Sequence, residues 1–479
     1  MNSKHAAFML CCALLSSCAV GPNFIRPTPP AATGYTTPQD ADAGADRKDS
    51  AQRAMLGQQI QGSWWNLFRS EAIDSIVAQA VEHNKSLEAS TATLRQARDL
   101  AIASEGARYP QIGLTAGVGR QKYGQELFGG SFNLPPFTYF AVGPTVSYTL
   151  DYTGGIARGI EEQRAMAEVT RHQLDAAYLT VTGQAVMQTL AIASARAQIA
   201  TIETILQQDR DNLRLVQTAF DEGSVARIDV VSAQSQIASD MALLPPLRQE
   251  LAHAHHALSI MLGQPPANHL PPDLELTKVT LPQEIPVSLP SELAHRRPDI
   301  LAAEARLHAA TSAVGVAESN LYPKIQLNGS LGQQAVNAGD LFNSGNTAWS
   351  LISGLTMPLF DGGTLRAQKR AAVEAMHASA AYYEQTVLEA FAQVADLLDA
   401  LNHDAEQLDA QAHAQQAAQS NLDLARASYA EGNAGIVQVL DAQRTFQQAR
   451  LGYVRSEAQR YLDTVQLFLA LGGTSPSGT

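Results

Sequence analysis

Two long stretches of the chain carry apolar residues at helical spacing and contain no proline. Proline is absent between Pro144 and Pro245 and again between Pro358 and Pro476. Within each stretch the apolar residues recur every seven positions, a pattern typical of long helices that supercoil around their neighbours. The seven-residue positions are Ile199, Leu206, Leu213 and Phe220 in the first stretch and Val394, Leu401, Leu408, Leu422 and Tyr429 in the second, where Gln415 fills the one place between Leu408 and Leu422. The pattern predicts helices at 155–221 and 363–430, each roughly 100 Å long at about 1.5 Å per residue.

Shorter elements surround each long helix. Apolar residues at three- and four-residue spacing predict a helix that begins near Ile73 and stops before Pro110, and a counterpart that begins at Pro298 and stops before Pro323. Alternation of apolar and polar residues predicts strands with one apolar face. The predicted strands are 110–122, 138–152, 323–334 and 348–360, the tips between helices are 222–227 and 431–436, and the return helices are 228–262 and 437–471.

The same order of elements occurs twice, which indicates an internal duplication. Gly223 in the first tip has its counterpart in Gly432, 209 residues later, and Gly263 has its counterpart in Gly472 at the same offset. In each half the short helix and the return helix together match the length of the long helix, so the two are expected to stack end to end beside it. The predicted parts are the structural repeats 71–264 and 294–473, an equatorial linker at 265–293 and a C-terminal tail at 474–479.

The four predicted strands admit two interpretations. Strands of roughly ten residues with one apolar face fit the wall of a membrane β-barrel, but a soluble hairpin with one buried face shows the same alternation. A sheet that spans lipid must close, because an open edge leaves backbone N–H and C=O groups without partners. Four strands cannot close, so a spanning sheet requires several chains, and three copies would supply twelve strands. This argument excludes a spanning monomer and does not by itself select three copies.

The N-terminus has the pattern of an exported lipoprotein. A basic residue and an apolar run precede Leu15-Ser16-Ser17-Cys18, which resembles a bacterial lipobox. This pattern predicts a signal peptide at 1–17, cleavage before Cys18 and a covalent lipid on that cysteine; an ordinary signal peptide with an incidental cysteine is the alternative. Ala19, where an aspartate would retain a lipoprotein elsewhere, favours the outer membrane. The stretch 18–70 is predicted to hold a tether rich in proline and alanine and the start of an equatorial region.

Composition and charge argue against several functions. The chain has 479 residues, of which 45% are hydrophobic and 16% charged, and its formal net charge of −13 disfavours nucleic acid as a partner. After the signal peptide no apolar run reaches the roughly 18 residues that a transmembrane helix needs. The sequence contains no Walker, HExxH, CxxC or GxSxG motif, so we expect neither enzymatic activity nor a metal site.

Two basic clusters have both a functional and a structural interpretation. His253 and His256 fall on one helical face, but a solvated face is the simpler interpretation because no further ligands lie nearby in the sequence. His295-Arg296-Arg297 could bind a phosphate group. Capping and ion pairing at the start of a helix is the safer interpretation.

A combination of motifs resembles the TolC-like outer-membrane factors (outer membrane efflux proteins), in particular their lipoprotein, NodT-type branch. The motifs are the lipobox, the segment Cys18-Ala19-Val20-Gly21-Pro22-Asn23, the duplication, Arg296-Arg297-Pro298-Asp299-Ile300 and Leu440-Asp441-Ala442-Gln443. The resemblance covers essentially the whole chain. It implies a mainly α protein with membrane β structure: a homotrimer whose twelve-stranded β-barrel, four strands per chain, continues into a long periplasmic α-helical barrel with an equatorial belt.

The resemblance also implies a role. The chain would be the exit duct of a tripartite efflux pump that exports small toxic compounds or drugs, lipid-anchored in the outer membrane of a Gram-negative bacterium. Its partners would be a periplasmic adaptor (membrane fusion) protein and an inner-membrane transporter of the RND or MFS type. No cofactor is implied apart from the lipid on Cys18. The duct of a type I protein secretion system is an alternative, and a structural coiled-coil lipoprotein is a further one.

Residues at the tips are assigned by the same resemblance. Asp441 and Val437 match a periplasmic gate, and Asp229 matches the acidic position of the first repeat. Three copies of Asp441 would narrow the pore axis and favour the passage of cations; an ordinary solvent-facing carboxylate is the alternative. Gln438 stands where some relatives carry another aspartate, which puts a second acidic ring in doubt.

The resemblance assigns the remaining tip residues to locking of the closed tip and to docking of the adaptor. Relatives can carry an arginine at the position of Ala434 that locks the tip, and here Arg444 is the candidate substitute, together with Tyr429. The turns at Gly223 and Gly432, with Ala434, are predicted to be the tips on which the adaptor docks.

Overall fold

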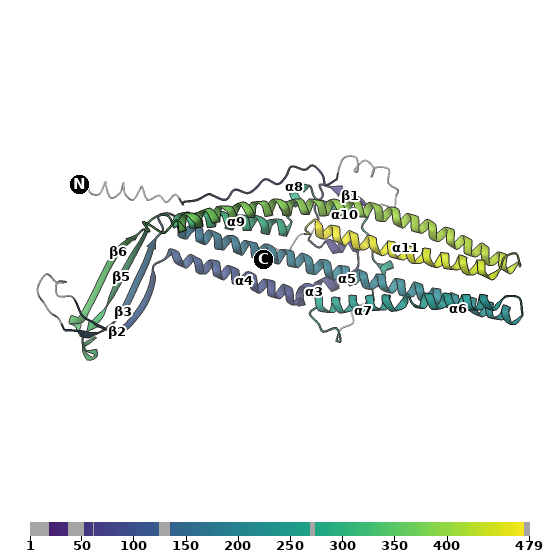
Figure 1. The fold of residues 1–479 in the computed structure, drawn as a ribbon, viewed down its shortest axis with the longest axis horizontal. Helices are drawn as coiled ribbons and strands as arrows, with labels where there is room; N and C mark the ends of the chain where they lie inside the picture. The colour runs from purple at the N-terminus through teal and green to yellow at the C-terminus, as the bar shows by residue number, and fades with distance from the viewer. Residues whose placement is uncertain (1–18, 37–51, 61, 124–134, 269–273, 474–479) are drawn as a thin grey trace. The chain divides into compact units, whose positions relative to one another are not determined.

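The computed structural model describes residues 19–36, 52–60, 62–123, 135–268 and 274–473 (Figure 1). The predicted signal peptide 1–17, the predicted lipid site Cys18 and the tail 474–479 lie outside the described residues. The chain divides into two compact units. The strand-bearing unit consists of Met1–Pro27, Thr93–Arg171 and Ala302–Tyr383, and the helical unit consists of Thr28–Ala92, His172–Leu301 and Glu384–Thr479. Both predicted repeats therefore contribute segments to each unit.

Four antiparallel strands form the sheet of the strand-bearing unit. Their order in the sheet is β2-β3-β5-β6, so the two hairpins of the two repeats lie side by side. The strands are β2 (Gln111–Gln121), β3 (Phe137–Leu150), β5 (Lys324–Ala335) and β6 (Thr347–Thr356). Within the described residues β2 and β6 each pair with one neighbour, so both edges of the sheet are open in the single chain.

One face of this sheet is apolar across all four strands. The register places Ile112 opposite Val146 and Val118 opposite Phe140, and the same face continues through Leu150 opposite Ile325. Apolar residues of β6, namely Trp349, Leu351 and Leu355, continue it on the other edge strand. None of the described residues covers this face: Leu114 and Leu351 are each 77% exposed. An apolar face of this kind requires lipid or further protein against it.

Equivalent aspartates begin the two long helices. Asp151 accepts hydrogen bonds from the N–H groups of Ile156 at 3.0 Å and Ala157 at 2.8 Å, at the start of α5 (Gly155–Asp221). Asp361 accepts from Leu365 at 2.8 Å at the start of α10 (Thr364–Ala430). Each carboxylate satisfies N–H groups that have no partner inside the helix and lies at the positive end of its dipole.

The helical unit is held by an aromatic core at one end of α11 (Ile436–Ala470). Trp64 and Phe68, in a short turn of 3-10 helix, pack with Phe468 at ring-centroid distances of 5.5 Å and 6.2 Å respectively. A two-stranded parallel sheet of β1 (Arg53–Leu56) and β4 (Glu284–Val287) belongs to the same unit, and α8 (Pro290–Leu293) follows it. Segments far apart in the sequence thus meet in the predicted equatorial region.

Two equivalent junctions join the short helices to the return helices. At the first, the amide of Asn84, between α3 (Glu71–His83) and α4 (Lys85–Glu105), donates to the carbonyl of Met261 at 3.0 Å, where α7 (Leu244–Met261) ends. At the second, the guanidinium of Arg297, before α9 (Pro298–Ser319), donates to the carbonyl of Ala470 at 2.9 Å, where α11 ends. The paired ends agree with the expected end-to-end arrangement of short and return helices.

Three predicted elements differ from the structure. The first return helix is two helices, α6 (Arg227–Met241) and α7, because Pro245 has no N–H and its ring would clash with a carbonyl in the preceding turn. The first short helix is divided at Asn84, which caps α4 with its side chain. The fourth strand ends at Thr356 and not at 360. The other predicted strands and long helices lie within two residues of the observed bounds. None of the described helices is long and apolar enough to cross a membrane.

Candidate functional site

The two hairpin tips share one backbone conformation. Gly223 and Gly432 have φ angles of +78° and +75°, a region that residues with a Cβ rarely adopt. In each turn the glycine N–H donates to the backbone carbonyl three residues before it, that of Phe220 at 2.9 Å and that of Tyr429 at 3.0 Å. The next N–H reaches five residues back, so both turns close their helix in the same way. The predicted tips at 222–227 and 431–436 are therefore matched structures.

A tip cluster of apolar side chains lies behind these turns, with contributions from both hairpins of the helical unit. Its buried residues are Val216 of α5, Val230 of α6, Ala418 and Leu422 of α10, and Ile436, Val439, Ala442 and Phe446 of α11. Tyr429, one of the predicted locking residues, is partly buried and packs against this cluster. Helix α11 supplies four of the buried residues and α6 only one, so the first return helix has the weaker hold on the tip.

The predicted gate residues lie on the surface of a single chain. Val437 is 57% exposed, in the first turn of α11. The side chain of Asp441 is 62% exposed and pairs with Arg444, one turn further along α11. The structure therefore joins one predicted gate residue to one predicted locking residue, as an ion pair within one helix.

Asp229 and Ala434 have local contacts. Asp229 accepts a hydrogen bond from the backbone N–H of Ala226 at 3.0 Å, which caps the start of α6. The N–H of Ala434 donates to the carbonyl of Ser428 at 3.2 Å within the second turn. The gate, locking and docking roles of these residues stay predictions.

A polar belt that the sequence analysis missed lies along the helices beyond the tip cluster. Gln443 and Gln447 of α11 donate from their amide nitrogens to Asp209 Oδ1 of α5, at 2.9 Å and 2.8 Å. Asn212 of α5 donates to the amide oxygen of Gln443. Asp240 of α6 completes the belt, and all five residues are at most 8% exposed. On the far side of the belt a second apolar cluster begins with Ile202 and Leu206.

The two acids of the belt contact one another. Burial, and then the hydrogen bond to Asp240, raise the pKa of Asp209 to about 7. The second hairpin has an acid pair of the same kind, Asp404 of α10 with Asp463 of α11. There burial, and then the hydrogen bond to Asp463, raise the pKa of Asp404 to about 7. Each hairpin therefore buries one carboxyl–carboxyl contact between its long helix and its return helix.

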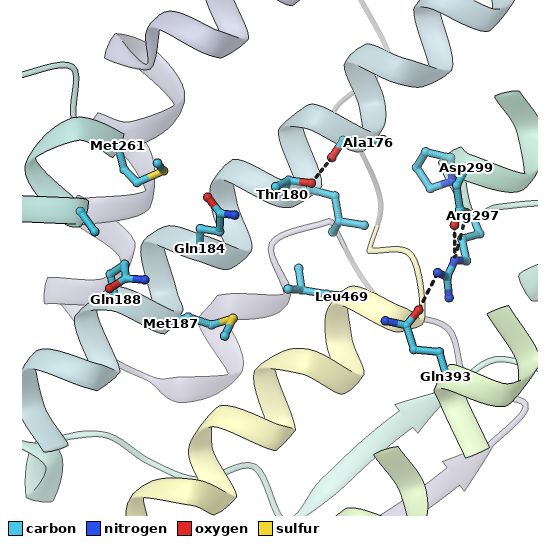
Figure 2. Close-up of a pocket in the computed structure, with 13 residues that line it drawn as sticks. Ala176, Thr180, Gln184, Met187, Gln188, Met261, Arg297, Asp299, Gln393 and Leu469 are labelled. Atoms are coloured by element: carbon cyan, nitrogen blue, oxygen red, sulfur yellow. Dashed lines mark hydrogen bonds and ion pairs between the residues drawn. The ribbon is translucent and has the colours of Figure 1, made fainter. Parts of the chain in front are cut away.

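A cavity of about 620 Å³ lies in the helical unit, next to the second junction (Figure 2). Met187 and Gln184 of α5 line it, with Met261 of α7 and Leu469 of α11. Arg297 borders the cavity, where its guanidinium donates to both carboxylate oxygens of Asp299, at 2.9 Å and 3.0 Å, and to the amide of Gln393 at 2.6 Å. These bonds agree with the structural interpretation of His295-Arg296-Arg297 as a cap and ion pair at a helix start.

The segment after the predicted lipid site is fixed to the strand-bearing unit. Arg158 of α5, only 5% exposed, donates to the carbonyl of Val20 at 3.3 Å and to Asn23 Oδ1 at 2.6 Å. A Cβ on Gly21 would lie 2.5 Å from the Cα of Gly315 on α9, so glycine is required for this close approach. Phe24 stacks on His308 with ring centroids 4.5 Å apart. The chain is therefore ordered immediately after Cys18.

Comparisons with known proteins agree on one family. The family described as outer membrane efflux protein matches residues 76–264 and 289–473. The pyoverdine export outer membrane protein OpmQ of Pseudomonas aeruginosa is 30% identical over 99% of this chain and 97% of its own. The probable outer membrane lipoprotein SilC of Salmonella typhimurium is 26% identical, over 96% of each chain. The structure of the outer-membrane channel OprN has a TM-score of 0.84 and 28% identity, and covers 95% of this chain and 99% of its own.

The fold and these relatives define the class of the protein. It is an outer-membrane channel of a Gram-negative bacterium, of the trimeric fold in which each chain adds four strands to a membrane β-barrel and long helices to an α-helical barrel. The chain belongs to the outer membrane efflux protein family, whose members are exit ducts. The predicted family, fold class and location are confirmed.

Proposed function

We propose that the protein is the exit duct of a tripartite pump that exports small toxic compounds or drugs, and that three chains assemble it. The observation that supports this most directly is the four-stranded sheet with one exposed apolar face and two open edges. Twelve strands from three chains would close those edges and turn the apolar face toward lipid. OpmQ carries pyoverdine export in its name, which favours a small organic compound over a protein as the substrate class.

A covalent lipid on Cys18 would anchor this duct in addition to the sheet. Ala19, the residue after Cys18, lies against Gly154, four residues after β3 ends. SilC, named as a lipoprotein, supports the same feature. Incorporation of labelled palmitate should therefore occur in the wild type and be lost in Cys18→Ala. Labelling that persists in the variant would contradict the assignment.

The duct would be closed at its tip by residues of the second repeat. Asp441 and Val437 are exposed in the single chain and free to face a pore axis shared with two other copies. Arg444 partly neutralises Asp441, so removing this arginine should increase the preference for cations, whereas removing Asp441 should decrease it. Tyr429 would hold the tip through the tip cluster, and Asp229 would act mainly as a helix cap.

An adaptor protein in the periplasm would open the tip by docking on the two matched turns, at Gly223, Gly432 and Ala434. An inner-membrane transporter of the RND or MFS type would supply the energy. A cysteine placed at Ala434 and carrying a photoreactive crosslinker should capture the adaptor in intact cells, and a cysteine at the sheet loop residue Gly339 serves as the matched control. Equal capture from both positions would contradict docking at the tip.

Export from intact cells distinguishes a drug duct from a protein-secretion duct. Deleting the gene should raise the accumulation of a fluorescent efflux substrate such as ethidium, and the wild-type gene should restore low accumulation. Unchanged dye accumulation together with the loss of a protein from the culture medium would favour a type I secretion duct. A structural coiled-coil lipoprotein would account for the long helices but not for the exposed apolar face of the sheet.

A further inference from the structure

The contact between Asp209 and Asp240 is incomplete as a set of ordinary hydrogen bonds. Asp209 Oδ1 accepts from two glutamines of α11, but no donor among the described residues reaches Asp209 Oδ2. Its remaining partner is Asp240, another carboxyl group. Two ionised carboxylates can only accept, so this buried contact is a hydrogen bond only when one of the two carries a proton.

Helix α6 has few buried side chains, and Asp240 is one of them. Its buried residues are Val230, Ala233 and Asp240, whereas α11 buries seventeen of its residues. Asp240 is thus one of the three buried side chains of α6, and the partly buried Ile237 also packs against the second apolar cluster. Because α6 buries little apolar area, the repulsion between two buried carboxylates is large relative to the free energy that its apolar contacts contribute.

A break between two helices lies close after Asp240. Helix α6 ends at Met241 and α7 begins at Leu244, with Pro245 in its first turn. The second return helix, α11, crosses the equivalent position without a break. Residues 242–243 would therefore be the pivot of any movement of α6 relative to α7, and the second return helix has no such break.

We propose that Asp209 and Asp240 form a proton-binding site that holds α6 against α5 when protonated and releases it when the proton is lost. The tips would then loosen on the first hairpin as the periplasm moves from acidic toward neutral pH. The release itself does not depend on the protein being a channel; its effect on export rests on the proposed function.

The charged groups around the pair do not replace the proton. Arg426 of α10 donates to the amide oxygen of Gln443 at 3.3 Å. Arg444 and Arg455 of α11 line a groove of about 530 Å³ beside Asp240, where Arg444 pairs with Asp441 and Arg455 donates to Gln198 at 3.0 Å. The groove gives water a route to Asp240, while the three guanidinium groups have partners other than the acid pair.

The direction of the effect follows from linkage. The pKa of Asp209 in the folded chain, about 7, is above the ordinary aspartate value of 3.8, so the folded form binds the proton more tightly than the opened form. The stabilisation is complete below pH 3.8, falls as the pH rises and is lost above pH 7. Opening of α6 should therefore become about tenfold more frequent for each pH unit between these limits and constant above them.

Hydrogen exchange of the full-length protein in detergent tests this directly. Exchange rates are measured at pH 5, 6, 7 and 8 and divided by the intrinsic exchange rate at each pH. The protection of the amides of residues 230–241 should fall about tenfold per pH unit up to pH 7 and stay constant above it. Asp209→Asn, or Asp240→Asn if the first variant folds poorly, should remove the slope. Asp211→Asn, a change to a half-buried aspartate of α5 that pairs with Arg214, should keep the slope.

Constant protection in the wild type from pH 5 to 7, or a slope that persists in Asp209→Asn, would overturn the proposal. Planar-bilayer currents from the same preparations separate it from the proposed function. If amide protection depends on pH but no current is seen, the channel function is contradicted and the proton site is supported. If a current is seen but amide protection does not depend on pH, only the proton site is contradicted.

Discussion

Gln443 of α11 donates a hydrogen bond to Asp209 of α5 across 2.9 Å and so ties the second helical hairpin to the first. Its amide oxygen accepts from Asn212 of α5 and from Arg426 of α10 at 3.3 Å. One side chain, 1% exposed, therefore connects three helices through both ends of its amide.

Gln443→Ala should destabilise the helical unit. The change leaves Asn212 without its acceptor and removes one of two donors to Asp209, and a buried polar group that loses its partner costs about 1–3 kcal/mol. Thermal unfolding of the purified protein, followed by circular dichroism, measures the loss. Gln448→Ala, on the exposed face of the same helix, is the control and should stay within about 0.5 kcal/mol of the wild type. An equal loss in both variants would contradict a special role for Gln443.

Gly332→Ala should hinder formation of the sheet. A Cβ at this position would lie 2.5 Å from the carbonyl oxygen of Val142 on the neighbouring strand, and backbone cannot yield as a side-chain end can. We expect a clear drop in the fraction of protein that resists dissociation by detergent at room temperature. Gly354→Ala, with open space around its Cβ on β6, should assemble like the wild type. Normal assembly of the Gly332 variant would show that the two strands can separate at this point.

Asp229→Ala should weaken the start of α6 and leave conduction unchanged. The loss of a helix cap costs about 0.5–2 kcal/mol, and the effect should appear as faster hydrogen exchange in residues 227–232. A marked change in cation selectivity of this variant would instead place Asp229 in the gate. Ser232→Ala, an exposed change on the same helix, provides the comparison.

Arg158→Lys should loosen the segment that follows the lipid site. A lysine cannot reproduce the forked contacts to Val20 and Asn23, so cleavage between residues 19 and 30 by an added protease should become several-fold faster. Arg171→Lys alters a half-buried arginine of the same helix, which pairs with Glu168 at 2.7 Å, and should not affect cleavage. Equal cleavage in wild type and Arg158→Lys would mean that the Phe24–His308 stack and the hydrogen bond from Arg26 to Glu304, at 2.7 Å, hold the segment without Arg158.

Much of the architecture was predictable because it repeats. Several features have a local physical cause and could therefore be predicted from the sequence alone. They are the glycines at 223 and 432, the aspartate before each long helix and the alternation along the strands. The break before α7 was not predicted although Pro245 marks it, and the second return helix, α11, has no break at the equivalent position.

The polar belt was missed for a different reason. Asp209 lies three residues after Leu206 and four before Leu213, a position of the apolar stripe, so a buried acid could have been suspected. Its partners Gln443 and Asp240 come from segments far apart in the sequence, and no local pattern brings them together. The four strands were predicted from their alternation, but the pairing of β3 with β5, which joins the two repeats in one sheet, required the structure.

Single-channel recording of the purified protein in planar lipid bilayers tests the central claim, that this chain forms a duct closed at its tip. The wild type should give small, stepwise, cation-selective currents. Asp441→Ala, which removes three carboxylates from the proposed constriction, should give larger and less cation-selective steps. The absence of stepwise currents from detergent-resistant trimers of both proteins would contradict the duct, and identical currents from the two would contradict the position of its gate.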